Sequence, residues 1–215
     1  MNAMQSIDQL SVTRFLDELA GAGATPGGGS AAAIMGAMGA ALVSMVANLT
    51  LGKKGYEAAE PAMRALLADS EALRRRLAGM VAEDVAAFDA LMAAWRLPKA
   101  SEAEQAARGA AVQAALRAAT ESPLACARAC AEVVRLAERA AALGNVNAIS
   151  DAGVGALAAW AALRGAALNV QVNTPQITDR DYAGRARAEI DALLAECGPR
   201  AERVHEAVKL RLGGG

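Results

Sequence analysis

Aromatic residues are scarce in this sequence. They make up 3% of its 215 residues, although 54% of the residues are hydrophobic. Much of the apolar content is therefore alanine, whose small side chain lets neighbouring helix axes approach closely. This composition favours a domain of tightly packed helices and gives no sign of an aromatic-rich binding surface.

The residues that most often carry catalysis or bind metals are few. His205 is the single histidine, and it falls in a charged segment where surface packing explains it. Cys126 and Cys130 resemble half of a metal site, but a zinc ion needs four ligands, or three and a water, and no second half follows. With Cys197 they are too few for a disulfide framework and indicate a reduced, cytoplasmic protein. Nucleophile-elbow, P-loop and dinucleotide-binding motifs are also absent, so triad hydrolysis and metal-dependent hydrolysis have little support.

The charge balance and the apolar runs argue against two further classes, nucleic-acid-binding proteins and membrane proteins. The formal net charge is −1 and no block of Lys and Arg stands apart from the acids, so a nucleic-acid partner is not expected. Residues 1–10 are mostly polar and do not read as a signal peptide. The run from Ala31 to Ala47 is short, rich in Ala and Gly, and lacks flanking aromatics. We predict a buried core helix there rather than a membrane span.

Apolar residues recur at steps of three and four along almost the whole chain, and no alternation typical of a strand is long enough to defend. The predicted helices cover about 13–20, 30–51, 57–95, 101–143, 151–172 and 179–212. Pro123 is expected to interrupt the fourth of these, with Ser122 capping a new segment. The third helix would be about 55 Å long, which is typical of an elongated bundle. We predict one all-α domain over residues 1–215, an elongated antiparallel bundle of long helices with small-residue packing.

The turn Thr25-Pro26-Gly27-Gly28-Gly29-Ser30 leads directly into the small-residue helix. Pro26 fixes its own φ, whereas the three glycines open backbone conformations closed to other residues. Ser30 is expected to be the N-cap of the helix. Backbone N–H groups at such a junction can bind an anion or a polar ligand. The simpler interpretation is a well-capped turn with no ligand.

Polar residues also interrupt the Ala- and Gly-rich helices. They are Asn48 and Thr50 before Lys53 and Lys54; Glu83, Asp84 and Asp89; Asn145, Asn147, Ser150 and Asp151; and Asn169, Gln171 and Asn173. Capping or solvation explains each of them singly. Their joint placement in small-residue surroundings points to a ligand, because buried polar groups need partners.

Five blocks of sequence carry a specific resemblance. They are the glycine turn, Met45–Lys54, Glu83–Asp89 with Leu97-Pro98-Lys99, Gly144–Gly153 and Ala166–Asn173. In these blocks and their order, which together span roughly residues 10–210, the sequence resembles the cyclodeaminase/cyclohydrolase family of folate enzymes. The resemblance is to the stand-alone cyclohydrolases end to end, with no formiminotransferase domain attached.

The resemblance implies an activity and two alternatives. The implied reaction is hydrolysis of 5,10-methenyltetrahydrofolate to 10-formyltetrahydrofolate in one-carbon metabolism of the serine-cycle type. The first alternative is formiminotetrahydrofolate cyclodeaminase, which releases ammonia; the second is a non-catalytic helical interaction module. The family also implies a homodimer with a folate cleft close to the subunit contact. No metal or bound cofactor is expected, since the substrate carbon is already electrophilic.

The implied mechanism needs a carboxylate that accepts and returns a proton near a cationic carbon. Asp84 or Asp151 is the candidate, with Asn145, Asn147 and Ser150 orienting water or the pterin. The acidic tail of the folate, a glutamate or polyglutamate, needs cations. Lys53, Lys54 and Lys99 are the candidates, each beside a helix break. The remaining predicted substrate contacts are Pro26, Gly27, Gly28, Gly29, Ser30, Asn48 and Asn169.

Overall fold

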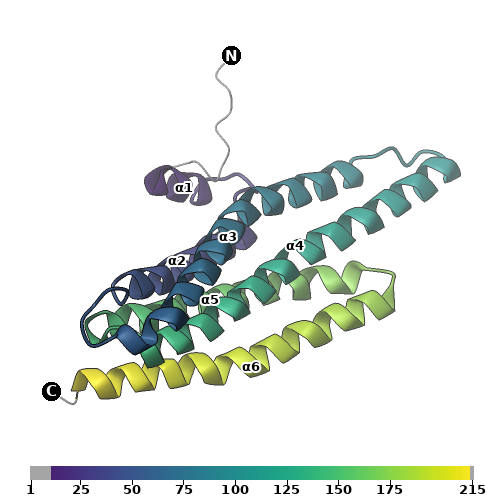
Figure 1. Cartoon of the computed structure of the whole chain (residues 1–215). Helices are drawn as coiled ribbons and strands as arrows, with labels where there is room; N and C mark the ends of the chain where they lie inside the picture. The colour runs from purple at the N-terminus through teal and green to yellow at the C-terminus, as the bar shows by residue number, and fades with distance from the viewer. Residues whose placement is uncertain (1–10, 214–215) are drawn as a thin grey trace.

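Long helices run back and forth along one another in the computed structural model, which describes residues 11–213 (Figure 1). The α-helices are α1 (Val12–Leu19), α2 (Gly28–Asn48), α3 (Glu60–Trp95), α4 (Glu102–Leu143), α5 (Ile149–Asn173) and α6 (Arg180–Gly213). Single 3-10 turns, η2 (Glu57–Ala59), η3 (Val146–Ala148) and η4 (Thr174–Gln176), join some of them. Within this range there is no strand, and the prediction of an elongated all-α bundle is confirmed.

Helix α5 lies at the centre of the bundle. It packs against α2, α4 and α6, while α3 covers α2 and α4 (Figure 1). Where α2 crosses α5, a Cβ on Gly39 would lie 2.8 Å from the carbonyl oxygen of Gly155, and a Cβ on Gly155 would lie 3.1 Å from that of Gly39. The two backbones are therefore in direct contact, as the small-residue composition predicts.

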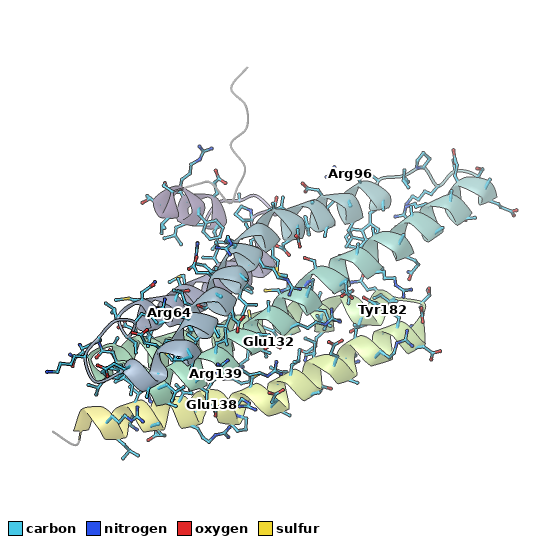
Figure 2. All side chains as sticks on the ribbon, viewed as in Figure 1. Arg64, Arg96, Glu132, Glu138, Arg139 and Tyr182 are labelled. Atoms are coloured by element: carbon cyan, nitrogen blue, oxygen red, sulfur yellow. The ribbon has the colours of Figure 1, made fainter. Side chains whose placement is uncertain are left out.

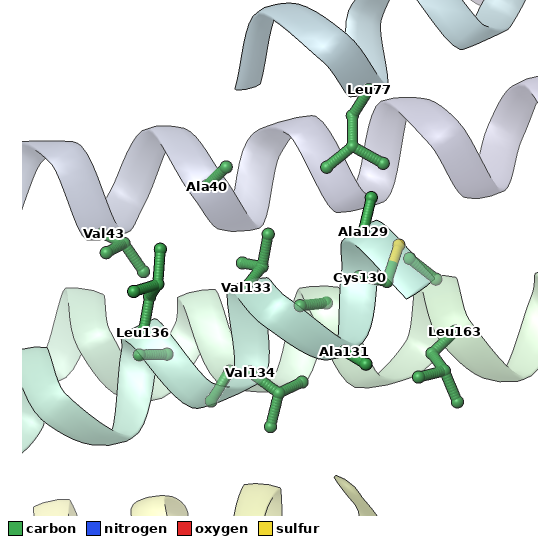
Figure 3. Close-up of a cluster of buried hydrophobic side chains, with 14 of the residues drawn as sticks. Ala40, Val43, Leu77, Ala129, Cys130, Ala131, Val133, Val134, Leu136 and Leu163 are labelled. Atoms are coloured by element: carbon green, nitrogen blue, oxygen red, sulfur yellow. The ribbon is translucent and has the colours of Figure 1, made fainter. Parts of the chain in front are cut away.

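The core is made of small and aliphatic side chains. Figure 3 shows Val43 of α2 beside Leu136 of α4, and Leu77 of α3 above Ala129 and Cys130 of α4. The prediction of a core helix over 31–47 is confirmed, because ten residues of α2 are buried. By length and composition α2 and the segment 146–176 could each cross a membrane, but 56% and 50% of their most apolar windows are buried within the bundle. Core helices of soluble proteins commonly meet the same criterion.

The predicted interruption of α4 at Pro123 is wrong, because the helix runs unbroken from Glu102 to Leu143. Proline has no N–H to donate to the carbonyl four residues earlier, which leaves the Ala119 oxygen without its helical partner. The side chain of Asn173, at the end of α5, donates from Nδ2 to that oxygen over 2.8 Å. A neighbouring helix thus satisfies the carbonyl that the proline leaves free.

The predicted N-cap at Ser30 is also wrong. Helix α2 begins at Gly28, with Gly27 as the extended N-cap residue, and the Ala31 N–H donates to the Gly27 carbonyl oxygen over 3.0 Å. Ser30 lies in the first turn and has no exposed surface. Because the turn contains three glycines, the helix can start before the serine, and the hydroxyl is free to contact another helix.

Candidate functional site

A carboxylate from the middle of α3 lies against the first turn of α2. The hydroxyl of Ser30 donates to Asp84 Oδ2 over 2.8 Å, and the nearby Ser30 backbone N–H also favours the ionised carboxylate. A Cβ on Gly29 would lie 2.1 Å from Asp84 Oδ1. Only glycine therefore lets the carboxylate approach this closely. The positive end of the α2 dipole further favours a negative group at this point.

Two features of its surroundings shift the pKa of Asp84 in opposite directions. Burial raises the pKa of the Asp84 carboxyl above its ordinary value, and the hydrogen bonds from Ser30 oppose that rise. Within residues 11–213 no cation forms an ion pair with it. The carboxylate is held firmly in position, yet no fixed charge keeps it ionised. It is suited both to accept and to release a proton.

Asp84 borders two hollows. A cavity of about 10 Å³, lined in part by Asp84, Ser122 and Cys126, has roughly the volume that one water molecule requires. A larger cleft of about 240 Å³, here called the Asp84 cleft, lies between α3, α4 and α5. The carboxylate can thus contact a small polar molecule on one side and a larger ligand on the other.

The Asp84 cleft has apolar and polar walls. Phe88 and Trp95 of α3 and Pro123 of α4 supply apolar surface, and Asn169 and Asn173 of α5 supply amides. Asn169 Nδ2 donates to the Gly165 carbonyl oxygen over 3.0 Å, just as Asn173 Nδ2 donates to the carbonyl freed by the proline. Both amides therefore use their nitrogen within the fold. Their oxygens remain available as hydrogen-bond acceptors, on residues that line the same cleft as Asp84.

The structure brings together one group of the predicted site residues. Gly28, Gly29, Ser30, Asp84 and Asn169 meet where α2, α3 and α5 converge, and a Cβ on Gly28 would lie 4.0 Å from Asn169 Nδ2. Pro26 and Gly27 directly precede this point in the chain, and Pro26 is buried. Ser30 contacts Asp84 and is closed to solvent, so its hydroxyl serves the carboxylate rather than a ligand.

A second group lies at the opposite end of α2, which has 21 residues and is therefore about 30 Å long. Here Asn145 is fully engaged in joining two loops. Its backbone N–H donates to Thr50 Oγ1 over 2.8 Å, its Nδ2 donates to the Leu49 carbonyl oxygen over 2.9 Å, and its Oδ1 accepts from the Asn147 N–H over 3.0 Å. Asn145 is 4% exposed, and its contacts explain it as a structural anchor.

The other predicted residues divide between this loop end and a third location. Asn48, Lys53, Lys54, Asn147 and Ser150 are exposed at the loop end of α2, and Asp151 is half-buried in the first turn of α5. Lys99 is exposed in the connection between α3 and α4. Within one chain, therefore, the two candidate carboxylates lie at opposite ends of α2, and only Asp84 faces the cleft described above.

Nine of the eleven residues that line the Asp84 cleft were not among the predicted site residues, and Trp95, Asn173 and Gln176 are three of them. Asn173 has a usable signal in the sequence, since a proline within a long helical pattern leaves a carbonyl that some side chain must satisfy. Trp95 and Gln176 have no such signal. Within residues 11–213, no group of three or more His, Cys, Asp or Glu side chains is placed to hold a metal ion.

Comparisons with known proteins agree with this architecture. Residues 11–192 match the formiminotransferase-cyclodeaminase family. The chain is 55% identical to a methenyltetrahydrofolate cyclohydrolase of Methylorubrum extorquens, over 94% of this chain and 97% of that protein. It is 35% identical to the formimidoyltransferase-cyclodeaminase of Sus scrofa, over 96% of this chain but only 38% of that longer protein.

A solved structure is also similar. The crystal structure of formiminotetrahydrofolate cyclodeaminase from Thermotoga maritima superposes with a TM-score of 0.79 and 32% identity, covering 97% of this chain and 98% of that one. Sequence and fold agree over nearly the full length, and the chain belongs to the formiminotransferase-cyclodeaminase family.

Proposed function

We propose that this protein is a methenyltetrahydrofolate cyclohydrolase, which hydrolyses 5,10-methenyltetrahydrofolate to 10-formyltetrahydrofolate. The observation that carries the proposal is the half-buried Asp84 carboxylate, held by Ser30 and facing a cleft. The near full-length 55% identity to a protein of that name supports the same reaction. The cyclodeaminase relatives are 35% identical or less over similar lengths of this chain.

The cleft suits a cationic ligand that is rich in hydrogen-bond donors. Three oxygen acceptors gather there, from Asp84, Asn169 and Asn173, and no cation faces them within residues 11–213. The methenyl substrate carries a positive amidinium-like carbon, and its pterin ring presents N–H donors. A negative field beside that carbon favours its binding and stabilises the charge that shifts during attack.

In the proposed mechanism, a water molecule adds to the methenyl carbon and forms a new C–O bond. Asp84 accepts a proton from that water, and the cavity it shares with Ser122 is a suitable place for the water to bind. The bond between the carbon and the pterin ring nitrogen then breaks, and Asp84 returns its proton to that nitrogen. The second proton of the water leaves to solvent, which gives the formyl group. A single carboxylate serves as base and then as acid.

This mechanism requires no metal and no covalent nucleophile, because the substrate carbon is already electrophilic. The cyclodeaminase alternative uses a related carbon but expels ammonia. An assay with both substrates separates the two activities. We expect the purified protein to hydrolyse the methenyl substrate rapidly in the presence of a metal chelator, measured as loss of its absorbance. It should release little ammonia from the formimino substrate. Ammonia release faster than methenyl hydrolysis would establish the cyclodeaminase instead.

We also propose a homodimer formed through the outer faces of α2 and α5. These faces expose apolar side chains, including Met38 and Met45 on α2, Leu49 directly after it, and Val154 and Leu168 on α5. Apolar surface of this kind often marks a protein–protein contact. Sedimentation velocity is expected to give twice the chain mass for the wild type and a shift toward monomer for Met45→Glu. A monomeric wild type at micromolar concentration would contradict the proposal.

A further inference from the structure

We propose that the substrate lies lengthwise in the Asp84 cleft, with its reacting carbon at Asp84 and its acidic tail at the α3–α4 tip. The α3–α4 tip is defined here by Arg96, Lys99 and Arg108, whose cationic side chains would bind the glutamate carboxylates. This inference rests on the proposed function, because it takes a folate as the ligand. It adds a direction of binding and a specific tail site.

One face of α3 lines the Asp84 cleft from end to end. Asp84, Phe88, Leu91 and Trp95 recur at steps of three and four residues and all line the cleft. Trp95 lies eleven positions after Asp84, which corresponds to about 16 Å along the helix axis. A folate is elongated like the cleft: its reacting carbon is followed by an aminobenzoyl ring and then by glutamate. Phe88 and Trp95 offer apolar surface where that ring would lie.

The two ends of the cleft differ. At the Asp84 end, the first turn of α2 closes the cleft so tightly that even a Cβ on Gly29 would clash with the carboxylate. At the other end, Trp95 is 37% exposed and Gln176 is exposed as well. A tail of several carboxylates must remain in solvent or meet cations, so it has to leave at the Trp95 end.

Cations gather at that open end. Arg108 of α4 donates from Nε and Nη2 to the carbonyl oxygen of Trp95, over 3.2 and 3.0 Å, so its guanidinium lies next to a residue of the cleft wall. Arg96 is the next residue of the chain, and Figure 2 shows it at the end of α3. The Lys99 carbonyl oxygen accepts from the Gln105 side chain over 3.2 Å, which fixes the connection that carries this lysine.

These cations differ in their partners from the arginines between α4 and α6. Between α4 and α6, Arg128 pairs with Glu189 and Arg135 with Glu196, each over 2.6 Å. Arg96, Lys99 and Arg108 have no carboxylate within 4.0 Å in the described part of the chain; its ion pairs all involve other residues. The nearby Glu104 is engaged by the backbone N–H groups of Ala100 and Ser101. The tip cations are therefore available to an acidic ligand.

The geometry separates the lysines that the sequence proposes together as tail contacts. Lys99 belongs to the α3–α4 tip. Lys53 and Lys54 lie at the loop end of α2, about 30 Å from Asp84 in the same chain. This separation provides a matched control, because the same number of exposed positive charges can be removed at either end of the molecule.

The test compares the double variants Arg96→Ala/Lys99→Ala and Lys53→Ala/Lys54→Ala with mono- and triglutamylated methenyl substrate. For the tip variant we expect the KM for the triglutamate to rise about 5- to 10-fold, with a smaller rise for the monoglutamate and kcat unchanged. The loop-end variant is expected to match the wild type. A larger effect at the loop end, or equal effects on both substrates, would overturn the proposed direction of binding.

A binding measurement keeps this test independent of turnover. Trp95 and Trp160 are the two tryptophans of the chain, and Trp160 packs on Gly198 between α5 and α6, away from the cleft. Titration with folic acid should quench the fluorescence of Trp160→Phe, which retains Trp95, more strongly than that of Trp95→Phe. Equal quenching after correction for absorbance would exclude the proposed position of the aminobenzoyl ring. Strong quenching of Trp160→Phe without methenyl turnover would refute the cyclohydrolase reaction and leave the binding direction standing.

Discussion

Asp84→Asn is expected to lower kcat for methenyltetrahydrofolate hydrolysis by about 10²- to 10⁴-fold, the range typical for loss of a general acid–base group. The amide keeps an oxygen that can accept from Ser30, so the contact between α2 and α3 survives. It can no longer take a proton from water or return one to nitrogen. Steady-state kinetics with circular dichroism as a folding check would measure the effect.

The same variant should gain stability where the wild type loses it. Because the folded-state pKa of Asp84 is raised, its contribution to stability is greatest when it is protonated and declines as pH rises through that pKa. Urea denaturation at pH 7 is therefore expected to show Asp84→Asn as more stable than the wild type, with the difference vanishing near pH 3. In the active enzyme, kcat/KM should fall on the acid side with a pKa above the ordinary aspartate value.

Asp151→Asn is the matched control for this prediction. Asp151 is the other candidate carboxylate, and it lies at the start of α5, about the length of α2 away from the cleft. We expect near wild-type turnover from Asp151→Asn. Loss of activity in that variant together with retained activity in Asp84→Asn would reassign the base to the other end of the molecule.

Gly29→Ala should reduce turnover by on the order of 10²-fold, although it adds only one methyl group. The new Cβ would lie 2.1 Å from Asp84 Oδ1, so either the carboxylate or the start of α2 has to move. Displacement of a reacting group by about 1 Å can cost a factor of this size. The crowding should also destabilise the fold by about 1–3 kcal/mol, the usual penalty for overpacking.

Gly184→Ala provides the comparison for Gly29→Ala. A Cβ on Gly184, in α6, would have no neighbour within 4 Å. Alanine should therefore stabilise that helix by about 0.5–1 kcal/mol and leave kcat unchanged. Thermal unfolding and steady-state rates of the two variants would be compared. Wild-type turnover in Gly29→Ala would show that the close approach of Asp84 to α2 has no part in the reaction.

The bundle could be predicted from the sequence because its helices follow from local pattern. The steps of three and four in α3, and the small residues of α2 and α5, define long helices and their buried faces without any tertiary information. The errors fall where tertiary contacts override local rules. Pro123 stays within a helix because Asn173 satisfies the carbonyl it frees, and Ser30 is not a cap because Asp84 takes its hydroxyl.

The candidate site was harder to predict, because residue type alone does not show which polar side chains lie together in the fold. Asn145 and Asn169 both stand in Ala-rich surroundings, yet one joins two loops and the other borders the cleft. Lys53 follows the C-terminal end of α2 and Lys99 follows that of α3, but the two helices run in opposite directions, so the lysines lie at opposite ends of the bundle. Which residues meet is decided by where each helix lies in the bundle, and a single sequence does not contain that information.

The contact between Gly39 and Gly155 has a consequence for catalysis. The helices that carry Ser30 and Asn169 cross where backbone meets backbone, and peptide groups have no rotamers through which to yield. The spacing of these two walls is therefore set in advance of binding, and a ligand spends little of its interaction energy on reshaping them. Such rigidity is an advantage for an enzyme that, in the proposed mechanism, must hold a water molecule in position to attack the methenyl carbon of its substrate.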